Sequence, residues 1–228
     1  MQLKILSWNI WCDGDFEKTC EFLRASNADI IGLQEVIPED KARDVTSYLS
    51  GLGYEYAISP KSVTFDDGRT ITTAVFSKVM MLQEKPHTLL AGSPQQAEMS
   101  IVVGDRVFHI FSIHLKHTHQ QEADIQKVQV ESLLATLPKE NVIVMGDFNA
   151  TPEMTPIKQM HEVLTDTDSL ELPTLNAQLF DCKTCDRALL PAAKLDYIFV
   201  SPDVRAHSFE VLKSDASDHL PVSAILEL

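Results

Sequence analysis

One stretch of the chain, residues 142–152, has the sequence VIVMGDFNATP and sets the strongest limit on the fold. Its first four residues are apolar and mostly β-branched, which predicts a strand buried on both faces. Gly146, Asp147 and Asn149 follow at the C-terminal end, where glycine permits an unusual backbone path. Asp147 and Asn149 are two residues apart, so in an extended backbone they point the same way and can hold a water or a cation. A simple turn after a core strand accounts for the same residue types.

The length and composition predict one soluble domain spanning 1–228. The 228 residues are enough to bury a substantial core, and the apolar content of 44% and charged content of 23% are ordinary for a globular protein. The sequence has neither an apolar run of transmembrane length nor a signal-peptide pattern at its start. We therefore expect a cytoplasmic protein without a transmembrane segment.

The charge balance is strongly acidic. Lys and Arg number 19 and Asp and Glu number 33, which gives a formal net charge of −14. Broad binding of nucleic acid independent of sequence depends on a basic surface, so this balance argues against it. A local basic groove remains compatible with the same composition.

The four cysteines offer one short motif, the CxxC of Cys182 and Cys185. A structural zinc site needs a second cysteine pair or histidines at a matching spacing, and Cys12 and Cys20 do not supply that pair. We expect reduced thiols without a specific role. A zinc site and a redox pair remain the alternatives.

The pattern of apolar residues predicts many strands and a few helices. The predicted helices span 15–26, 39–49, 121–137 and 154–164, and Ile125, Val128, Leu133 and Leu134 are expected on the buried face of the third. The predicted strands span 3–10, 29–36, 54–58, 71–77, 98–103, 106–115, 142–145, 195–200, 204–211 and 222–226. We expect two packed sheets with helices outside.

Polar residues recur within these apolar strands, at their ends or just before them. They are Asn9, Glu35, His114, Asp147, Asn149, Asp196 and the pair Asp218 and His219. Each alone is compatible with an ordinary strand-end residue. Because an unpaired buried carboxylate costs several kcal/mol, the four acidic residues are best explained by one pocket in which a cation or histidines offset their charge.

Six short motifs containing these residues occur in the order of a known family: SWNI at 7–10, LQEV at 33–36, SIHL at 112–115, GDFN at 146–149, LDYI at 195–198 and SDHLP at 217–221. With these motifs the chain resembles the metal-dependent endonuclease/exonuclease/phosphatase superfamily. The resemblance implies an α+β fold, a four-layer sandwich in which helices flank two mixed sheets packed face to face.

The resemblance also implies roles for individual residues. Glu35, with Asn9 nearby and Asp218 beside it, would bind a catalytic Mg²⁺ or Mn²⁺. Asp147 and Asn149 would position the attacking water and the scissile phosphate. The remaining three would complete the acid–base machinery: Asp196 would hydrogen-bond His219, and His114 would face the leaving group. Either Asp147 or His219 could take the proton from water, and the sequence leaves both open.

The resulting expectation is a Mg²⁺- or Mn²⁺-dependent phosphoester hydrolase, in particular a phosphodiesterase or nuclease acting on DNA or RNA. The alternative is a phosphodiesterase or phosphatase acting on a small or lipid-derived phosphoester. Trp11 stands where abasic endonucleases tend to have Asp, which argues against close similarity to the DNA-repair branch. A binding module without catalysis is disfavoured because every central residue is present, and no protein partner is readable.

Overall fold

Two βαβ units organise the structure, a computed structural model that describes residues 2–38, 40–82, 92–180, 185 and 187–227. The first unit consists of β1 (Gln2–Asn9), α1 (Phe16–Ser26) and β2 (Ile30–Val36), and the second of β8 (Arg106–His114), α3 (Asp124–Leu134) and β9 (Val142–Asp147). The two strands of each unit are parallel because the helix returns the chain to the starting edge. Each unit therefore brings two strand C-termini to the same end of a sheet.

Each unit lies inside a mixed sheet. The first sheet has seven strands in the order β12-β13-β1-β2-β5-β3, with β4 paired to β5, and the second has six in the order β10-β11-β9-β8-β7-β6. The remaining strands are β3 (Glu55–Ile58), β4 (Val63–Thr64), β5 (Thr70–Ser77), β6 (Met81–Leu82), β7 (Gln95–Val103), β10 (Thr165–Asp166), β11 (Asp196–Val200), β12 (Arg205–Val211) and β13 (Val222–Glu227).

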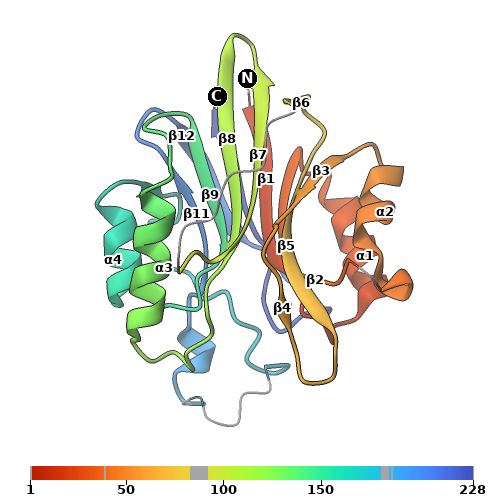
Figure 1. Ribbon diagram of the computed structural model, residues 1–228, viewed down its shortest axis with the longest axis vertical. Helices are drawn as coiled ribbons and strands as arrows, with labels where there is room; N and C mark the ends of the chain where they lie inside the picture. The colour runs from red at the N-terminus through yellow and green to blue at the C-terminus, as the bar shows by residue number, and fades with distance from the viewer. Residues whose placement is uncertain (1, 39, 83–91, 181–184, 186, 228) are drawn as a thin grey trace.

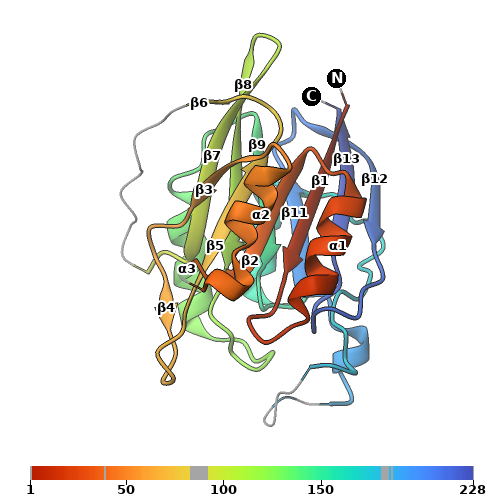
Figure 2. The ribbon, with the colours of Figure 1, turned by 90° about the vertical axis from the view of Figure 1, so that its right-hand side faces the viewer.

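The elements form four layers. In Figure 1 α1 and α2 (Val45–Gly51) cover the outer face of the first sheet, and α3 and α4 (Thr155–His161) cover that of the second. Figure 2, turned by 90°, shows α1 and α2 lying across β1 and β2. This arrangement confirms the predicted α+β sandwich. None of the helices in the described part of the chain is long and apolar enough to cross a membrane.

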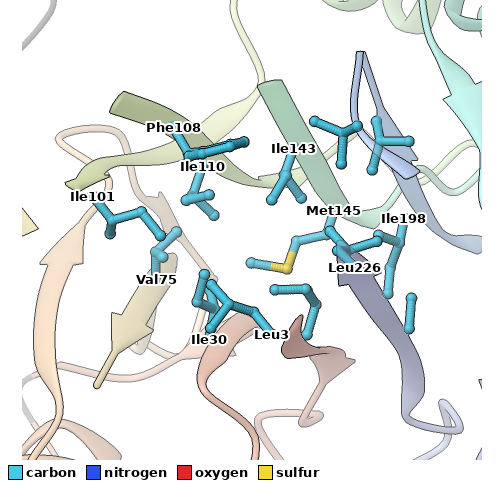
Figure 3. Close-up of a cluster of buried hydrophobic side chains, with 14 of the residues drawn as sticks. Leu3, Ile30, Val75, Ile101, Phe108, Ile110, Ile143, Met145, Ile198 and Leu226 are labelled. Carbon is cyan, nitrogen blue, oxygen red and sulfur yellow. The ribbon is translucent and has the colours of Figure 1, made fainter. Parts of the chain in front are cut away.

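The main core fills the space between the sheets. Leu3, Ile30 and Val75 of the first sheet face Ile143 and Met145 of the second (Figure 3). All are at most 4% exposed, and burying one such side chain stabilises the fold by about 1.5–3 kcal/mol. The packing between the sheets holds the strand ends of both at a constant separation.

The first two helices begin at aspartates. Asp15 caps α1, as predicted, because its side chain accepts a hydrogen bond from the backbone N–H of Lys18 at 3.1 Å. The predicted helix 39–49 is wrong as one element. It consists of a short 3₁₀ helix, Lys41–Arg43, followed by α2, because Asp44 accepts a hydrogen bond from the N–H of Ser47 at 2.8 Å and caps a new helix there.

The third helix is shorter than the predicted 121–137 and buries a different face. Leu133 is buried as expected, but Ile125 and Val128 are 45% and 43% exposed. Gln126 is fully buried instead, because its amide donates hydrogen bonds to backbone carbonyls of two adjoining loops. The apolar pattern misplaced this face because a glutamine that binds backbone can replace an apolar residue in a core. The short strand β4 was also not predicted, and β7 begins three residues before the expected start at 98.

Candidate active site

Three neighbouring strands of the second sheet carry polar residues at the same end of the sheet. His114 of β8 pairs in register with Asp147 of β9, and Asp147 pairs with Asp196 of β11. Asp147 is 1% exposed and Asp196 is fully buried. The Oδ2 atom of Asp147 lies 3.4 Å from Nε2 of His114. The sheet register thus places the buried Asp147 carboxylate between an imidazole and a second carboxylate.

The pairing beside Asp147 depends on Gly146. Its φ is +148°, and a Cβ atom at this position would overlap the carbonyl oxygen of Ile113 on β8. Asn149 follows with a φ of +47°, so the chain turns sharply after the strand. This turn lets the N–H of Asn149 donate to Oδ1 of Asp147 at 2.7 Å and its side-chain amide to Oδ2 at 3.0 Å. Both oxygens of the carboxylate are thereby held in place.

The first sheet contributes Asn9 and Glu35 at the same end. Glu35 has a φ of +59° and lies where the register of β2 against β5 shifts, a bulge that redirects its side chain. The amide of Asn9 donates to Oε1 of Glu35 and to Oδ2 of Asp147, both at 3.1 Å. The other oxygen of Glu35 accepts the N–H of Cys12 at 3.0 Å. Asn9 therefore connects the site residues of the two sheets.

Hydrogen bonds hold the segment before β13 against β1. Ser217 donates its hydroxyl to the carbonyl of Asn9 at 2.7 Å, and the indole N–H of Trp8 donates to the carbonyl of His219 at 2.9 Å. These bonds position the His219 ring, whose Nδ1 lies 2.8 Å from Oδ2 of Asp196. The Asp196 contact leaves Nε2 of His219 directed at Asp147, 3.7 Å from its Oδ2.

The charges of these groups depend on one another. Burial alone would lower the pKa of His219, but Asp196 and Asp147 outweigh it and raise that pKa well above its ordinary value. Burial alone would raise the pKa of Asp147, but His219, His114 and hydrogen bonds outweigh it and lower that pKa. At neutral pH the site therefore holds a protonated His219 beside an ionised Asp147.

The pKa values of two further site residues, His114 and Asp218, are also shifted. For His114, burial again acts to lower the pKa, and the hydrogen bond and charge of Asp147 more than compensate, so the pKa is raised. The carboxyl group of Asp218 has its pKa raised to about 6 by burial and by the charges of Glu35 and Asp147. Burial thus disfavours the ionised form of Asp218, and the charge of His219 offsets this only in part.

A cleft of about 1040 Å³ opens onto these side chains. Its lining includes seven of the eight predicted site residues: Asn9, Glu35, His114, Asp147, Asn149, Asp218 and His219. Asp196 lies behind His219 and does not line it. The rest of the lining is mixed. It includes the aromatic side chains of Trp11, Phe65 and Phe180, the amines of Lys61 and Lys116, and further polar residues such as Asp13, Gln95 and Gln129.

The donor set suits a hard divalent cation on one side of the cleft. Asn9, Glu35 and Asp218 offer amide and carboxylate oxygens, and a cation would offset the cost of burying the Asp218 carboxylate, whose pKa is raised mainly by that burial. The donor atoms of another set, Asp147, Asp196 and His219, lie within 4.8 Å of one another. There the protonated imidazole already sits between the two carboxylates, and its positive charge opposes a cation. The chemistry therefore fits a cation at Asn9, Glu35 and Asp218.

The model of the Endonuclease/Exonuclease/phosphatase family matches residues 6–219, which include every residue of this site. The chain belongs to this family. It is accordingly an enzyme of a family that hydrolyses phosphoester bonds. No curated protein sequence matches the chain.

Solved structures of family proteins share the fold. The human Nocturnin catalytic domain with bound sulfate anion is 23% identical over 99% of this chain and 93% of its own, with a TM-score of 0.74. The 2',3'-cyclic phosphatase ANGEL2 is 14% identical over 99% and 95%, with a TM-score of 0.72. An AP endonuclease from Archaeoglobus fulgidus is 16% identical over 99% and 100%, with a TM-score of 0.68. At these identities the similarity establishes the fold alone.

Sequence reasoning missed three residues that support the site. Thr174 is fully buried, and its hydroxyl oxygen accepts the N–H of Asp196 at 3.0 Å. The Phe180 ring lies 6.4 Å from the ring of His219. Thr174 and Phe180 belong to a stretch without a periodic pattern, so no sequence signal marked them. Gln126, which donates to the carbonyl of Asn149 at 2.8 Å, was visible only as a polar residue within a predicted helix.

The cysteines differ from expectation in part. Cys12 and Cys20 are free thiols, as predicted. Cys185 is disulfide-bonded, so the prediction of a reduced thiol is wrong there. Cys182 lies outside the described residues.

Proposed function

We propose that this chain is a Mg²⁺- or Mn²⁺-dependent phosphodiesterase in which a water oriented by Asp147 and Asn149 attacks the phosphorus atom in line with the leaving oxygen. The observation that supports this most is the state of Asp147. It is a buried, ionised carboxylate at a cleft, held by two amides and flanked by His114 and His219. Such a group can orient a water and accept its proton.

Asn9, Glu35 and Asp218 would hold the metal ion. When bound, the ion would neutralise charge on the non-bridging phosphate oxygens and thereby favour attack. Carboxylate and amide oxygens are the ligands that Mg²⁺ and Mn²⁺ prefer. The hydrogen bond from Asn9 to Asp147 would couple the metal side of the cleft to the water side.

The two histidines would act on the phosphate. Nδ1–H of His219 donates a hydrogen bond to Asp196, so the opposite nitrogen, Nε2, is the one presented to the cleft as a donor. Protonated His219 would donate to a non-bridging oxygen, while His114 would donate toward the leaving oxygen. Because the pKa of His219 is raised, its imidazole already carries the proton, so the ionised Asp147 is the group available to accept the water proton in the free enzyme.

The substrate we propose first is a nucleic-acid phosphodiester. The aromatic residues and amines of the cleft wall support it, because bases stack on aromatic rings and phosphates bind amines. A small or lipid-derived phosphoester is the second candidate. Two observations favour it: the net charge of −14, and a cleft of about 1040 Å³, near the upper size of small-molecule pockets.

The test combines a general substrate with a nucleic-acid substrate. Hydrolysis of an aryl phosphodiester and nicking of supercoiled plasmid, intact or partly depurinated, are measured in Mg²⁺ and in EDTA. His219→Ala should lower turnover about 10²–10⁴-fold without unfolding the protein. His207→Ala is the matched control, because His207 is exposed and contacts Glu227, away from the cleft.

Each outcome selects a substrate class. Mg²⁺-dependent cutting of only the depurinated plasmid would indicate an abasic-site nuclease, and cutting of both a general nuclease. Hydrolysis of the aryl ester without nicking would support the small-phosphoester alternative. Wild-type turnover in folded His219→Ala would disprove the assignment of this site.

A further inference from the structure

A second cluster of metal-binding residue types lies at the rim of the cleft. His117 and His119 belong to the loop between β8 and α3, and Cys185 to the segment that precedes β11. The Sγ atom of Cys185 lies 3.8 Å from Nε2 of His117 and 3.8 Å from Nδ1 of His119. These residues have no part in the proposed hydrolysis. His117 and His119, from another part of the chain, thus lie close enough to Cys185 to complete a metal site with this cysteine.

The geometry matches a tetrahedral nitrogen–sulfur site. Zinc binds cysteine sulfur at about 2.3 Å and histidine nitrogen at about 2.0–2.1 Å, which places the two donor atoms about 3.6 Å apart at a tetrahedral angle. The sulfur–nitrogen separations here are both 3.8 Å, and all three donor atoms lie within 4.8 Å of one another. An ion could therefore bind with side-chain adjustments of a few tenths of an ångström.

We propose that the reduced form of this protein binds one zinc ion through His117, His119 and Cys185. Thiolate with imidazole is a donor set that selects zinc over Mg²⁺, so the site differs in chemistry from the oxygen site at Asn9 and Glu35. The fourth coordination position takes water or a further donor.

Binding requires reduction of Cys185, which is disulfide-bonded in this structure. A dithiol reductant supplies two electrons and two protons: the S–S bond breaks, each sulfur becomes a thiol, and the reductant is oxidised to its own disulfide. The Cys185 thiol then releases its proton as it binds the metal. The oxidised form, by contrast, lacks the thiolate ligand.

A zinc ion at this cluster would affect the wall of the cleft near His219. Cys185 is 8% exposed, whereas His119 is exposed, so the ion would connect a histidine at the surface to a buried cysteine. The ring of His117 lies 6.1 Å from the ring of Phe180, which in turn lies 6.4 Å from that of His219. A bound ion would therefore fix the wall of the cleft next to the catalytic histidine.

Cobalt titration tests the assignment. Metal-stripped protein is reduced with excess dithiol, and the dithiol is then removed by gel filtration without oxygen, because it would itself bind cobalt through sulfur. The reduced protein is titrated with Co²⁺, and the near-ultraviolet thiolate-to-cobalt charge-transfer band is recorded, which an all-oxygen site cannot produce. We expect one equivalent of cobalt to bind with this band, to be displaced by Zn²⁺, and not to bind in this way without prior reduction. His117→Ala, His119→Ala and Cys185→Ser should each weaken binding at least about tenfold. Cys20→Ser, which removes a free thiol on α1, should bind as the wild type does.

A missing band in the reduced wild type would overturn the proposal, as would wild-type affinity in any one of the three variants that circular dichroism shows to be folded. X-ray absorption of the zinc-loaded, reduced wild type gives a test independent of variant folding. Sulfur and nitrogen shells at about 2.3 Å and 2.0 Å are expected. A shell of oxygen and nitrogen alone would show that zinc binds elsewhere.

Discussion

Replacing Gly146 with alanine tests the strand pairing that places His114 beside Asp147. The added Cβ would overlap the carbonyl oxygen of Ile113 and lie 2.9 Å from its carbonyl carbon, whereas ordinary contacts begin at 3.4 Å. The obstructing atoms are backbone, so no side-chain rotation relieves the overlap. Strands β8 and β9 must therefore separate by at least about 0.5 Å, the difference between these distances.

The expected loss of stability follows from two contributions. An alanine held at positive φ costs about 1–3 kcal/mol. Weakening one or two hydrogen bonds of the ladder costs about 0.5–1.5 kcal/mol each. The total is roughly 1.5–6 kcal/mol. In a domain of this length about 1 kcal/mol shifts the Tm by 2–4 °C. Gly146→Ala should therefore lower the Tm by roughly 3–24 °C.

Thermal unfolding followed by circular dichroism measures this change. Gly51→Ala is the matched control, because Gly51 is the last residue of α2 and a Cβ there meets no atom within 4 Å. Alanine at that position should leave the Tm unchanged or raise it slightly, since it reduces the freedom of the unfolded chain. A Gly146→Ala protein that melts within about 2 °C of the wild type, or a control that is equally destabilised, would refute the reasoning.

Three further predictions concern charged groups. Asp196→Asn removes a negative charge that raises the pKa of His219 against the effect of burial. The alkaline limb of the pH profile of kcat/KM should therefore move to lower pH. A limb that does not move would contradict this role of Asp196. In the wild type the Lys194 amine lies 2.6 Å from the buried carboxylate of Asp166. Lys194→Met removes this partner and should lower the free energy of unfolding by about 3–5 kcal/mol at neutral pH. Burial already raises the pKa of Asp166, so the folded protein binds a proton more readily than the unfolded one, and stability is lost as pH rises. Urea unfolding should show a smaller loss at about pH 5 than at about pH 8. The pKa of about 6 at Asp218 means that protons compete with Mg²⁺ below this pH. The apparent dissociation constant for Mg²⁺, from activity titrations, should rise about tenfold per pH unit there, and Asp218→Asn should bind Mg²⁺ more weakly and without this dependence.

Much of the architecture was predictable because it is encoded locally. The apolar run before Gly146 identified a doubly buried strand, and Asp15 marked the start of α1. The same patterns placed Asn9 and His114 at strand ends, where the structure has them, whereas Asp196, expected within a strand, is the first residue of β11. Alternation of apolar residues and capping chemistry depend on neighbours within a few positions, so the sequence alone contains that information.

The face of α3 shows where local pattern is insufficient. Gln126 replaces the expected Ile125 on the buried side because two loops, distant in sequence from each other, present carbonyls to it. The predicted helix 39–49 divides at Asp44, which caps α2. The sequence contains this aspartate but does not show that it ends one helix and starts another. Both differences arise where a side chain exchanges hydrogen bonds with backbone.

The sequence by itself determined the family, the order of strands and helices, and the residue types available for chemistry. Only the tertiary structure decided which of them meet: Asn9 bonds to Asp147 across 138 positions, and Cys185 lies beside His117 and His119 although no local pattern connects them. It also decided their charges, since the raised pKa of His219 and the lowered pKa of Asp147 come from burial and from each other. Distances between remote residues, and the loss of water around them, arise only when the two sheets pack together.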